Sequence, residues 1–140
     1  MNGNLSPLFG SDTLSGMSVL GLAHVGDCVY ELMARTSLCR SGALTHRALH
    51  ASTVEMVCAG AQAEASRMLL PCLTAEERGV FMRGRNAKPH HIPKNANPAE
   101  YSLATALEAL FGYLYLSGRQ ERLEELFGAV LSGKTGAESC

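Results

Sequence analysis

The chain has 140 residues, of which 46% are hydrophobic and 18% are charged, and its formal net charge is −1. This length suits one globular domain with a buried core and is too short for a second full domain. The near-neutral charge does not by itself indicate a polyanionic partner, no apolar span approaches the roughly 20 residues of a membrane helix, and the N-terminal stretch lacks the basic start and apolar centre of a secretion signal. We therefore expect a soluble, intracellular protein with no membrane association.

The cysteines favour neither a disulfide framework nor a zinc site. The chain has five of them, an odd number, and they are irregularly spaced without a CxxC pair. We expect reduced thiols that mostly fill the core.

Helical periodicity begins near residue 17. Apolar residues recur at the 3.6-residue period over 17–34, which predicts a first helix. Ser52 is followed three residues later by Glu55 in the arrangement of a capping box. This pattern predicts a long helix over 53–70 that stops at Pro71.

The same capping arrangement recurs in the middle of the chain. Thr74 and Glu77 open a short helix that we expect to end within residues 82–87. The following stretch, residues 87–98, contains three prolines, which exclude a regular helix there.

Two further helices are predicted in the C-terminal part. Asn97 as N-cap and Pro98 at the first helical position start one of them. Gly118 fits its end, and residues 119–131 form a last amphipathic helix. No segment alternates like a strand, so the predicted fold class is all-α with about six helices.

The predicted helices make one domain over residues 17–131. Residues 1–16 are rich in Asn, Ser, Gly and Pro, and we expect them to form a flexible N-terminal arm. Residues 132–140 are expected to form a flexible tail.

Two carboxylates lie among apolar neighbours near the middle of predicted helices. Asp27 belongs to the run HVGDCVYE, and Glu108 belongs to ATALEALFG. A lone carboxylate that faces a core becomes neutral or costs several kcal/mol, so such groups are normally exposed, paired or bound to a metal. Two carboxylates from separate helices, together with water, are a typical Mg²⁺ site. The alternative is that each lies on the solvent-exposed edge of its helix.

Two glycines accompany these carboxylates. Gly26 precedes Asp27, and Gly112 lies one turn beyond Glu108. Glycine inside a helix costs about 1 kcal/mol relative to alanine, so these positions indicate close backbone approach or room for a ligand. Loose packing is the alternative interpretation.

Several ordered blocks of the sequence resemble mini-ribonuclease III, the short bacterial and plastid relatives of ribonuclease III. They are HVGDCVYE, LTHRALHASTVEMVCAGAQA, LTAEERGVFMRGRNAK, PKNANPAEYSLATALEALFGYLYLSG and RLEELF, which together run from about residue 20 to 127. The resemblance implies the helical ribonuclease III catalytic fold and a homodimer without a separate double-stranded-RNA-binding domain. It further implies an endoribonuclease that cleaves double-stranded RNA with Mg²⁺, for which Mn²⁺ is a possible substitute.

The resemblance also implies a substrate and partners. In this family the substrate is precursor large-subunit (23S) ribosomal RNA, matured in the cytoplasm, sometimes with help from a ribosomal protein. A competing hypothesis is a non-catalytic double-stranded-RNA-binding or ribosome-associated module on the same fold. The presence of both Asp27 and Glu108 argues against it, because a binding module has no need of both acids.

Residue roles follow from the matching motifs. GDCVYE places the catalytic, metal-binding aspartate at Asp27, and ATALEAL places the corresponding glutamate at Glu108. Full-length ribonuclease III has a further glutamate where this chain has Ala23, and a further aspartate where it has Thr105. These departures leave the number of metal ions open. The resemblance also implies that the first helix forms the dimer face, although its apolar stripe is equally explained by the core.

An acid-free basic stretch is the predicted RNA-binding element. No Asp or Glu occurs from residue 78 to 99, which holds five Lys and Arg residues. Four of them, Arg83, Arg85, Lys88 and Lys94, accompany Gly84 and the prolines and are the predicted RNA contacts. We expect a loop that contacts RNA phosphates across the minor groove and loses affinity as salt rises. An ordinary solvated loop is the alternative.

Several polar residues keep two interpretations. His46 and His50 have the i, i+4 spacing of metal ligands, but no third ligand follows at a recognisable interval, so we favour a surface or RNA-facing role. Gln62 either contacts RNA or belongs to a polar helix face.

Overall fold

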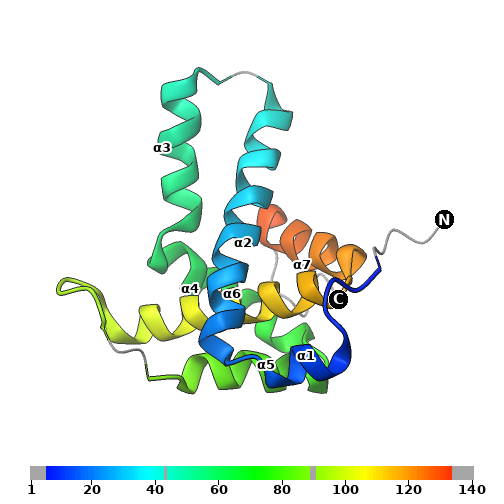
Figure 1. Cartoon of the computed structure of the whole chain (residues 1–140). Helices are drawn as coiled ribbons and strands as arrows, with labels where there is room; N and C mark the ends of the chain where they lie inside the picture. The colour runs from blue at the N-terminus through cyan, green and yellow to red at the C-terminus, as the bar shows by residue number, and fades with distance from the viewer. Residues whose placement is uncertain (1–5, 43, 89–90, 134–140) are drawn as a thin grey trace.

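The computed structural model describes residues 6–42, 44–88 and 91–133, and within these ranges the fold is all-α with no strand. The elements in chain order are α1 (Ser11–Gly16), α2 (Val19–Ser41), α3 (His46–Val57), α4 (Ala59–Leu69), the 3₁₀ turn η1 (Leu70–Cys72), α5 (Ala75–Asn86), α6 (Pro98–Leu116) and α7 (Gln120–Ser132) (Figure 1). The predicted fold class is confirmed, with seven α-helices in the described residues instead of about six.

Helix α6 is the centre of the molecule. It packs against α2, α4, α5 and α7, and Figure 1 shows α2 crossing it near the middle. Its buried residues join the main core, where the ring of Tyr30 from α2 makes edge contacts with Phe111 of α6 and Phe127 of α7. A side chain placed on α6 is therefore held by several neighbouring helices.

Two glycines allow α2 and α6 to touch through their backbones. A Cβ atom added to Gly26 would lie 1.6 Å from the carbonyl oxygen of Glu108, and one added to Gly112 would lie 2.0 Å from the carbonyl oxygen of Leu22. Any side chain at either position would force the helices apart. The structure therefore favours close backbone approach over loose packing as the reason for these mid-helix glycines.

The predicted long helix over 53–70 is wrong. Helix α3 starts at His46, where the Thr45 hydroxyl accepts a hydrogen bond from the Ala48 backbone N–H at 3.2 Å. The chain then breaks at Cys58, whose ψ of 157° is extended, and α4 starts afresh. Ser52 lies inside α3, so it is not an N-cap. The first helix also runs further than predicted, to Ser41.

The other helix boundaries follow the predicted caps. Thr74 and Glu77 form a capping box in which each backbone N–H donates to the other side chain, at 2.9 and 3.1 Å. The Asn97 side chain accepts hydrogen bonds from the first turn of α6. These local polar contacts explain why α5 and α6 start where the sequence predicts.

The described part of the predicted N-terminal arm has specific contacts. The backbone N–H groups of Leu8 and Phe9 donate to the carbonyl of Leu116 at 3.0 and 3.2 Å, and Phe9 and Leu14 pack beside Leu22. Residues 1–5 and 134–140 lie outside the described residues. The flexible arm, the flexible tail and the domain boundaries stay predictions.

In the described parts of the chain, no helix is both long and apolar enough to cross a bilayer.

Candidate active site

The two suspect carboxylates meet where α2 crosses α6. Asp27 follows Gly26 on α2, and Glu108 supplies the carbonyl that contacts Gly26. The two side chains are joined by a hydrogen bond. Both line a pocket of about 280 Å³, whose other lining residues are Val57, Ala59, Gln62, Tyr101, Ala104 and Thr105. The backbone contact between the helices therefore sets the spacing of the carboxylates.

The electrostatics of the pair disfavour two negative charges. Burial, the charge of Asp27 and the hydrogen bond that protonated Glu108 donates to Asp27 together raise the pKa of Glu108 to about 8. At neutral pH and without a cation, Glu108 is therefore mostly protonated and shares its proton with Asp27. A positive ion between the two groups would allow both carboxylates to ionise.

The pocket suits a hard cation. Its polar side chains, Asp27, Glu108, Gln62, Thr105 and Tyr101, offer oxygen atoms and neither imidazole nor thiolate. Within the described ranges no group of three or more His, Cys, Asp or Glu residues could hold a metal. Two carboxylates with water completing the coordination suit Mg²⁺, which keeps much of its hydration. The residues present thus fit this ion.

The comparisons with known proteins settle the family. The sequence profile of the ribonuclease III domain matches residues 20–119. The chain belongs to the ribonuclease III family. It is 47% identical to Mini-ribonuclease 3 of Symbiobacterium thermophilum over 111 residues, which is 79% of this chain and 85% of the relative. It is 44% identical to Mini-ribonuclease 3 of Enterococcus faecalis over 109 residues, 76% of this chain and 83% of that relative.

A solved structure supports the same assignment. The crystal structure of a Fusobacterium nucleatum protein superposes with a TM-score of 0.76 at 28% identity, covering 84% of this chain and 94% of the other. This ribonuclease III chain is therefore similar to the Mini-ribonuclease 3 branch in sequence, and it is an endoribonuclease.

Thr105 and Ala23, the two positions at which full-length ribonuclease III has a further acid, lie in different surroundings in this protein. Thr105 lines the carboxylate pocket, and its hydroxyl donates to the carbonyl of Tyr101 at 3.0 Å. Ala23 is buried in the apolar cluster around Leu22. The pocket therefore has two carboxylates, and neither departure is replaced by another acid among the described lining residues.

The predicted basic loop is partly helical. Arg83 and Arg85 lie in the last turn of α5, while Lys88 and Lys94 lie in the segment between α5 and α6, and all four are exposed. The prediction that the two arginines belong to a loop is wrong because Gly84 between them is buried against α6, where an added Cβ would lie 2.8 Å from the Cα of Ala106.

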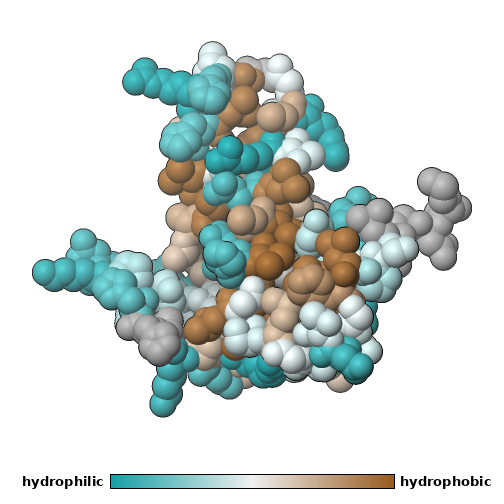
Figure 2. All heavy atoms as spheres, in the orientation of Figure 1, coloured by the Kyte–Doolittle hydropathy of each residue, from teal (hydrophilic) through white to brown (hydrophobic). Residues whose placement is uncertain are grey.

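This helical geometry directs the arginines outward. Residues on either side of an inward-facing position point away from the contact. The described residues between α5 and α6 lie in the hydrophilic region at the left of Figure 2. They lead into α6, which carries the pocket residues Tyr101 and Thr105. No ion pair between described residues involves these four cations.

The predicted histidine pair lies away from the carboxylates. His46 and His50 line a separate pocket of about 200 Å³ between α2 and α3, together with Arg35 and Cys39. The structure does not bring these histidines to Asp27 or Glu108.

Gln62 and Tyr101 are pocket residues that sequence reasoning did not place at the site. The sequence favours an RNA contact or a polar helix face for Gln62 and assigns no site role to Tyr101. The available signal was helical spacing, since Gln62 shares a face of α4 with buried Ser66. Helical spacing identifies the buried face of α4, but it does not show that this face borders the pocket with Asp27 and Glu108.

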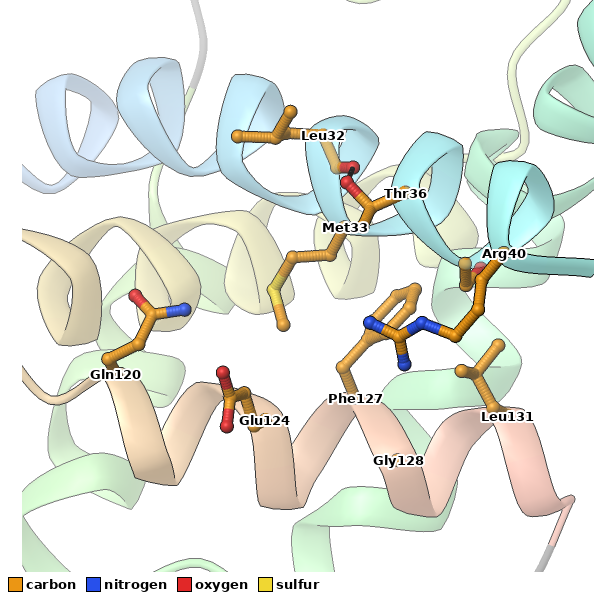
Figure 3. Close-up of a pocket in the computed structure, with 10 residues that line it drawn as sticks. Leu32, Met33, Thr36, Arg40, Gln120, Glu124, Phe127, Gly128 and Leu131 are labelled. Atoms are coloured by element: carbon orange, nitrogen blue, oxygen red, sulfur yellow. Dashed lines mark hydrogen bonds between the residues drawn. The ribbon is translucent and has the colours of Figure 1, made fainter. Parts of the chain in front are cut away.

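An apolar groove separates α2 from α7. One part, of about 400 Å³, is lined by the apolar residues Leu32, Met33, Phe127 and Leu131, by Gly128, and by the polar residues Thr36, Ser37, Arg40, Gln120 and Glu124. Figure 3 shows Met33 pointing from α2 toward α7. A second part, of about 380 Å³, shares Leu32 and Met33. Figure 2 shows hydrophobic surface over this region.

Proposed function

We propose that this endoribonuclease hydrolyses double-stranded RNA in a Mg²⁺-dependent reaction, with Asp27 and Glu108 as its catalytic, metal-binding residues. The observation that carries the proposal is the hydrogen-bonded carboxylate pair in a pocket of oxygen donors at the α2–α6 crossing. Mn²⁺ is expected to substitute for Mg²⁺, because it accepts the same ligands.

The two carboxylates are held in place by the packing of α2 on α6, so the site is preorganised for a ligand. The Gly26 and Gly112 contacts fix the two helix backbones, so little reorganisation is needed to place the carboxylates. Glu108 and Asp27 would hold the cation, and Glu108 would lose its proton on binding it, because the positive charge would outweigh the repulsion by Asp27. A bound Mg²⁺ would supply polarisation of the scissile phosphate and a lower pKa for water.

RNA is held by Arg83, Arg85, Lys88 and Lys94 in this proposal. All four are exposed, and no acid lies among them in the sequence. Phosphate contacts by such side chains release counterions, so duplex binding weakens as salt rises. The recognition is of duplex shape and backbone, which is how proteins commonly bind A-form RNA.

Self-association through α2 completes the proposed enzyme. Each chain offers one carboxylate pair, whereas a duplex has two strands related by an approximate two-fold axis, so a symmetric homodimer supplies one site for each strand. The groove between α2 and α7 supports this interface, because Leu32 and Leu131 are 64% and 51% exposed beside it. Exposed apolar area of this kind typically marks a partner surface.

Precursor 23S ribosomal RNA in the cytoplasm is the proposed biological substrate, with a large-subunit ribosomal protein as a possible partner. Its support is the resemblance to the mini-ribonuclease III family together with the sequence identity to Mini-ribonuclease 3 of two bacteria.

Cleavage of a long duplex RNA by the purified protein tests the reaction. We expect Mg²⁺-dependent cuts in both strands that EDTA abolishes and that Asp27→Asn and Glu108→Gln each lose, with duplex binding intact. Glu64→Gln is the matched control, since Glu64 is an exposed carboxylate on α4, paired only with Arg67 among the described residues.

The same assay separates the competing function. Wild-type protein that binds duplex RNA in a salt-sensitive way and never cleaves it would contradict the proposal. That result would favour the non-catalytic double-stranded-RNA-binding module.

A further inference from the structure

Gln62 is a buried polar residue whose side chain makes no hydrogen bond to the described residues of the protein. It is 3% exposed and lines the pocket that holds Asp27 and Glu108. The other buried polar or charged residues in the described part of the chain each make side-chain hydrogen bonds: Thr53 to the Leu49 carbonyl, Ser66 to the Leu103 carbonyl, and Glu77 to Arg122 and Thr74. No such bond joins the Gln62 carboxamide to any described residue.

An unpaired carboxamide in this position needs a partner from the pocket. Burying a polar group without a hydrogen bond is unfavourable, so native structures satisfy such groups with protein, water or ligand. No enclosed side-chain nitrogen or oxygen in the described part lacks a partner, which means that the Gln62 amide is not sealed off. Its remaining accessible surface opens to the pocket that it lines.

Helix α4 holds Gln62 firmly against α6. Before it in the chain, Gly60 faces the Glu100 side chain, where an added Cβ would lie 2.8 Å from Glu100 Oε2. After it, the Ser66 hydroxyl donates to the Leu103 carbonyl of α6 at 2.9 Å. Two contacts with α6 therefore flank Gln62 in the sequence. The packing of α4 on α6 thus sets the position of Gln62 relative to Glu108, which lies further along α6.

We propose that Gln62 is a positioning residue of the metal site, whose carboxamide oxygen accepts a hydrogen bond from water that hydrates the cation held by Asp27 and Glu108. This inference rests on the function proposed above. With two protein carboxylates, Mg²⁺ keeps several water ligands, and each of these donates hydrogen bonds. Gln62 offers one acceptor and two donors at the same pocket, so it orients the hydration shell as outer-shell partners of metals do.

Metal affinity in the absence of RNA is the direct test. Mg²⁺ binding is measured by titration calorimetry, and Mn²⁺ binding by electron paramagnetic resonance, on protein whose fold is checked by circular dichroism. Gln62→Met keeps the length of the side chain and removes the amide. We expect it to bind either ion about 10 to 100 times more weakly than the wild type, the usual effect of losing an outer-shell partner.

Ser66→Ala is the matched control. Ser66 is also a buried polar residue of α4, one turn further on, but its hydroxyl is satisfied by the Leu103 carbonyl and does not line the pocket. We expect its metal affinity to stay within about twofold of the wild type, since the outer-shell effect belongs to pocket residues.

Gln62→Glu provides a second variant that keeps an oxygen acceptor. It should bind the ions at least as tightly as the wild type, and this expectation tests the inference even if Gln62→Met fails to fold. Wild-type affinity in folded Gln62→Met, or weakened affinity in Gln62→Glu, would overturn the role of Gln62. That result leaves the proposed function standing as long as Asp27→Asn abolishes binding, whereas absence of metal binding by the wild type would overturn the metal site itself.

Discussion

Glu108 shows how the surroundings of one side chain change its chemistry. Burial and the neighbouring Asp27 raise the pKa of Glu108 from its ordinary value of 4.5 to about 8. The group therefore carries a proton at neutral pH without metal, and under the proposed function it would become a ligand once a cation is bound. Proton release should accompany metal binding near neutral pH.

The free energy of unfolding of the metal-free protein should depend on this proton. Because the pKa of Glu108 is higher in the folded state, the folded state binds more protons between about pH 4.5 and 8, and the contribution of Glu108 to stability decreases as pH rises through that window. Glu108→Gln lacks this effect. In EDTA it should become more stable than the wild type toward pH 8, by up to about 4 kcal/mol.

Chemical denaturation between pH 5 and pH 9 measures the difference. Glu64→Gln, which alters an exposed carboxylate, should follow the wild type throughout. Parallel curves for wild type and Glu108→Gln would contradict the buried, coupled state of Glu108.

At the scale of elements, the α2–α6 crossing holds both a close backbone contact between the two helices and the two carboxylates. The glycines that allow the contact lie beside or one turn from the carboxylates. Gly84 makes a similar close approach between α5 and α6. Helix α6 therefore receives two neighbouring helices through glycine, which brings the α5 arginines and the α2 aspartate onto helices packed against the same partner.

Alanine at Gly26 should be strongly destabilising. Its Cβ would overlap the Glu108 carbonyl, and neither backbone can yield without separating the helices. We expect a loss of roughly 3 kcal/mol or more in the free energy of unfolding, together with loss of metal binding.

Gly79→Ala is the control for this effect. Gly79 lies within α5 with no atom within 4 Å of an added Cβ, so alanine should stabilise the protein by about 0.5–1 kcal/mol through helix propensity. Urea denaturation compares both variants with the wild type. Equal changes in the free energy of unfolding for Gly26→Ala and Gly79→Ala would contradict the close backbone contact between α2 and α6.

Local polar contacts decided which helix boundaries could be predicted. The Thr74–Glu77 box and the Asn97 cap are formed by residues close in sequence, and both were predicted. The break at Cys58 has no comparable signal, because Cys58 makes no side-chain cap and the helices on either side pack on different neighbours. Tertiary contacts, absent from a sequence pattern, determine that boundary.

The candidate site was predictable where residues broke the helical pattern. Asp27 and Glu108 are charged residues in apolar stretches, and this conflict indicated a shared site. Gln62 produced no conflict, because a polar residue on an amphipathic helix is ordinary. Only the packing of α4 on α6 shows that it faces the carboxylates.

At the scale of the whole molecule, the apolar groove between α2 and α7 tests the proposed homodimer. Leu32 is 64% exposed and lines both parts of the groove. Leu32→Glu should leave the monomer folded and shift the molar mass measured by light scattering from dimer to monomer, because a charge opposes burial of the groove. Duplex cleavage should then fall or become confined to one strand.

Val54→Glu is the comparison for this substitution. Val54 is 50% exposed on α3 and does not line either part of the groove. It should keep the mass of the wild type. Dimers that persist in Leu32→Glu would place the interface elsewhere.

The backbone contact at Gly26 and Gly112 has a consequence for engineering. Because the crossing depends on main-chain atoms, the separation of the carboxylates does not rely on a particular set of large core side chains. If the exposed residues at the end of α5 and after it, such as Arg85 and Lys88, bind RNA as proposed, they can be randomised to alter RNA preference with little disturbance of this crossing. Libraries that keep the glycines fixed should therefore retain turnover across many substrate-binding surfaces.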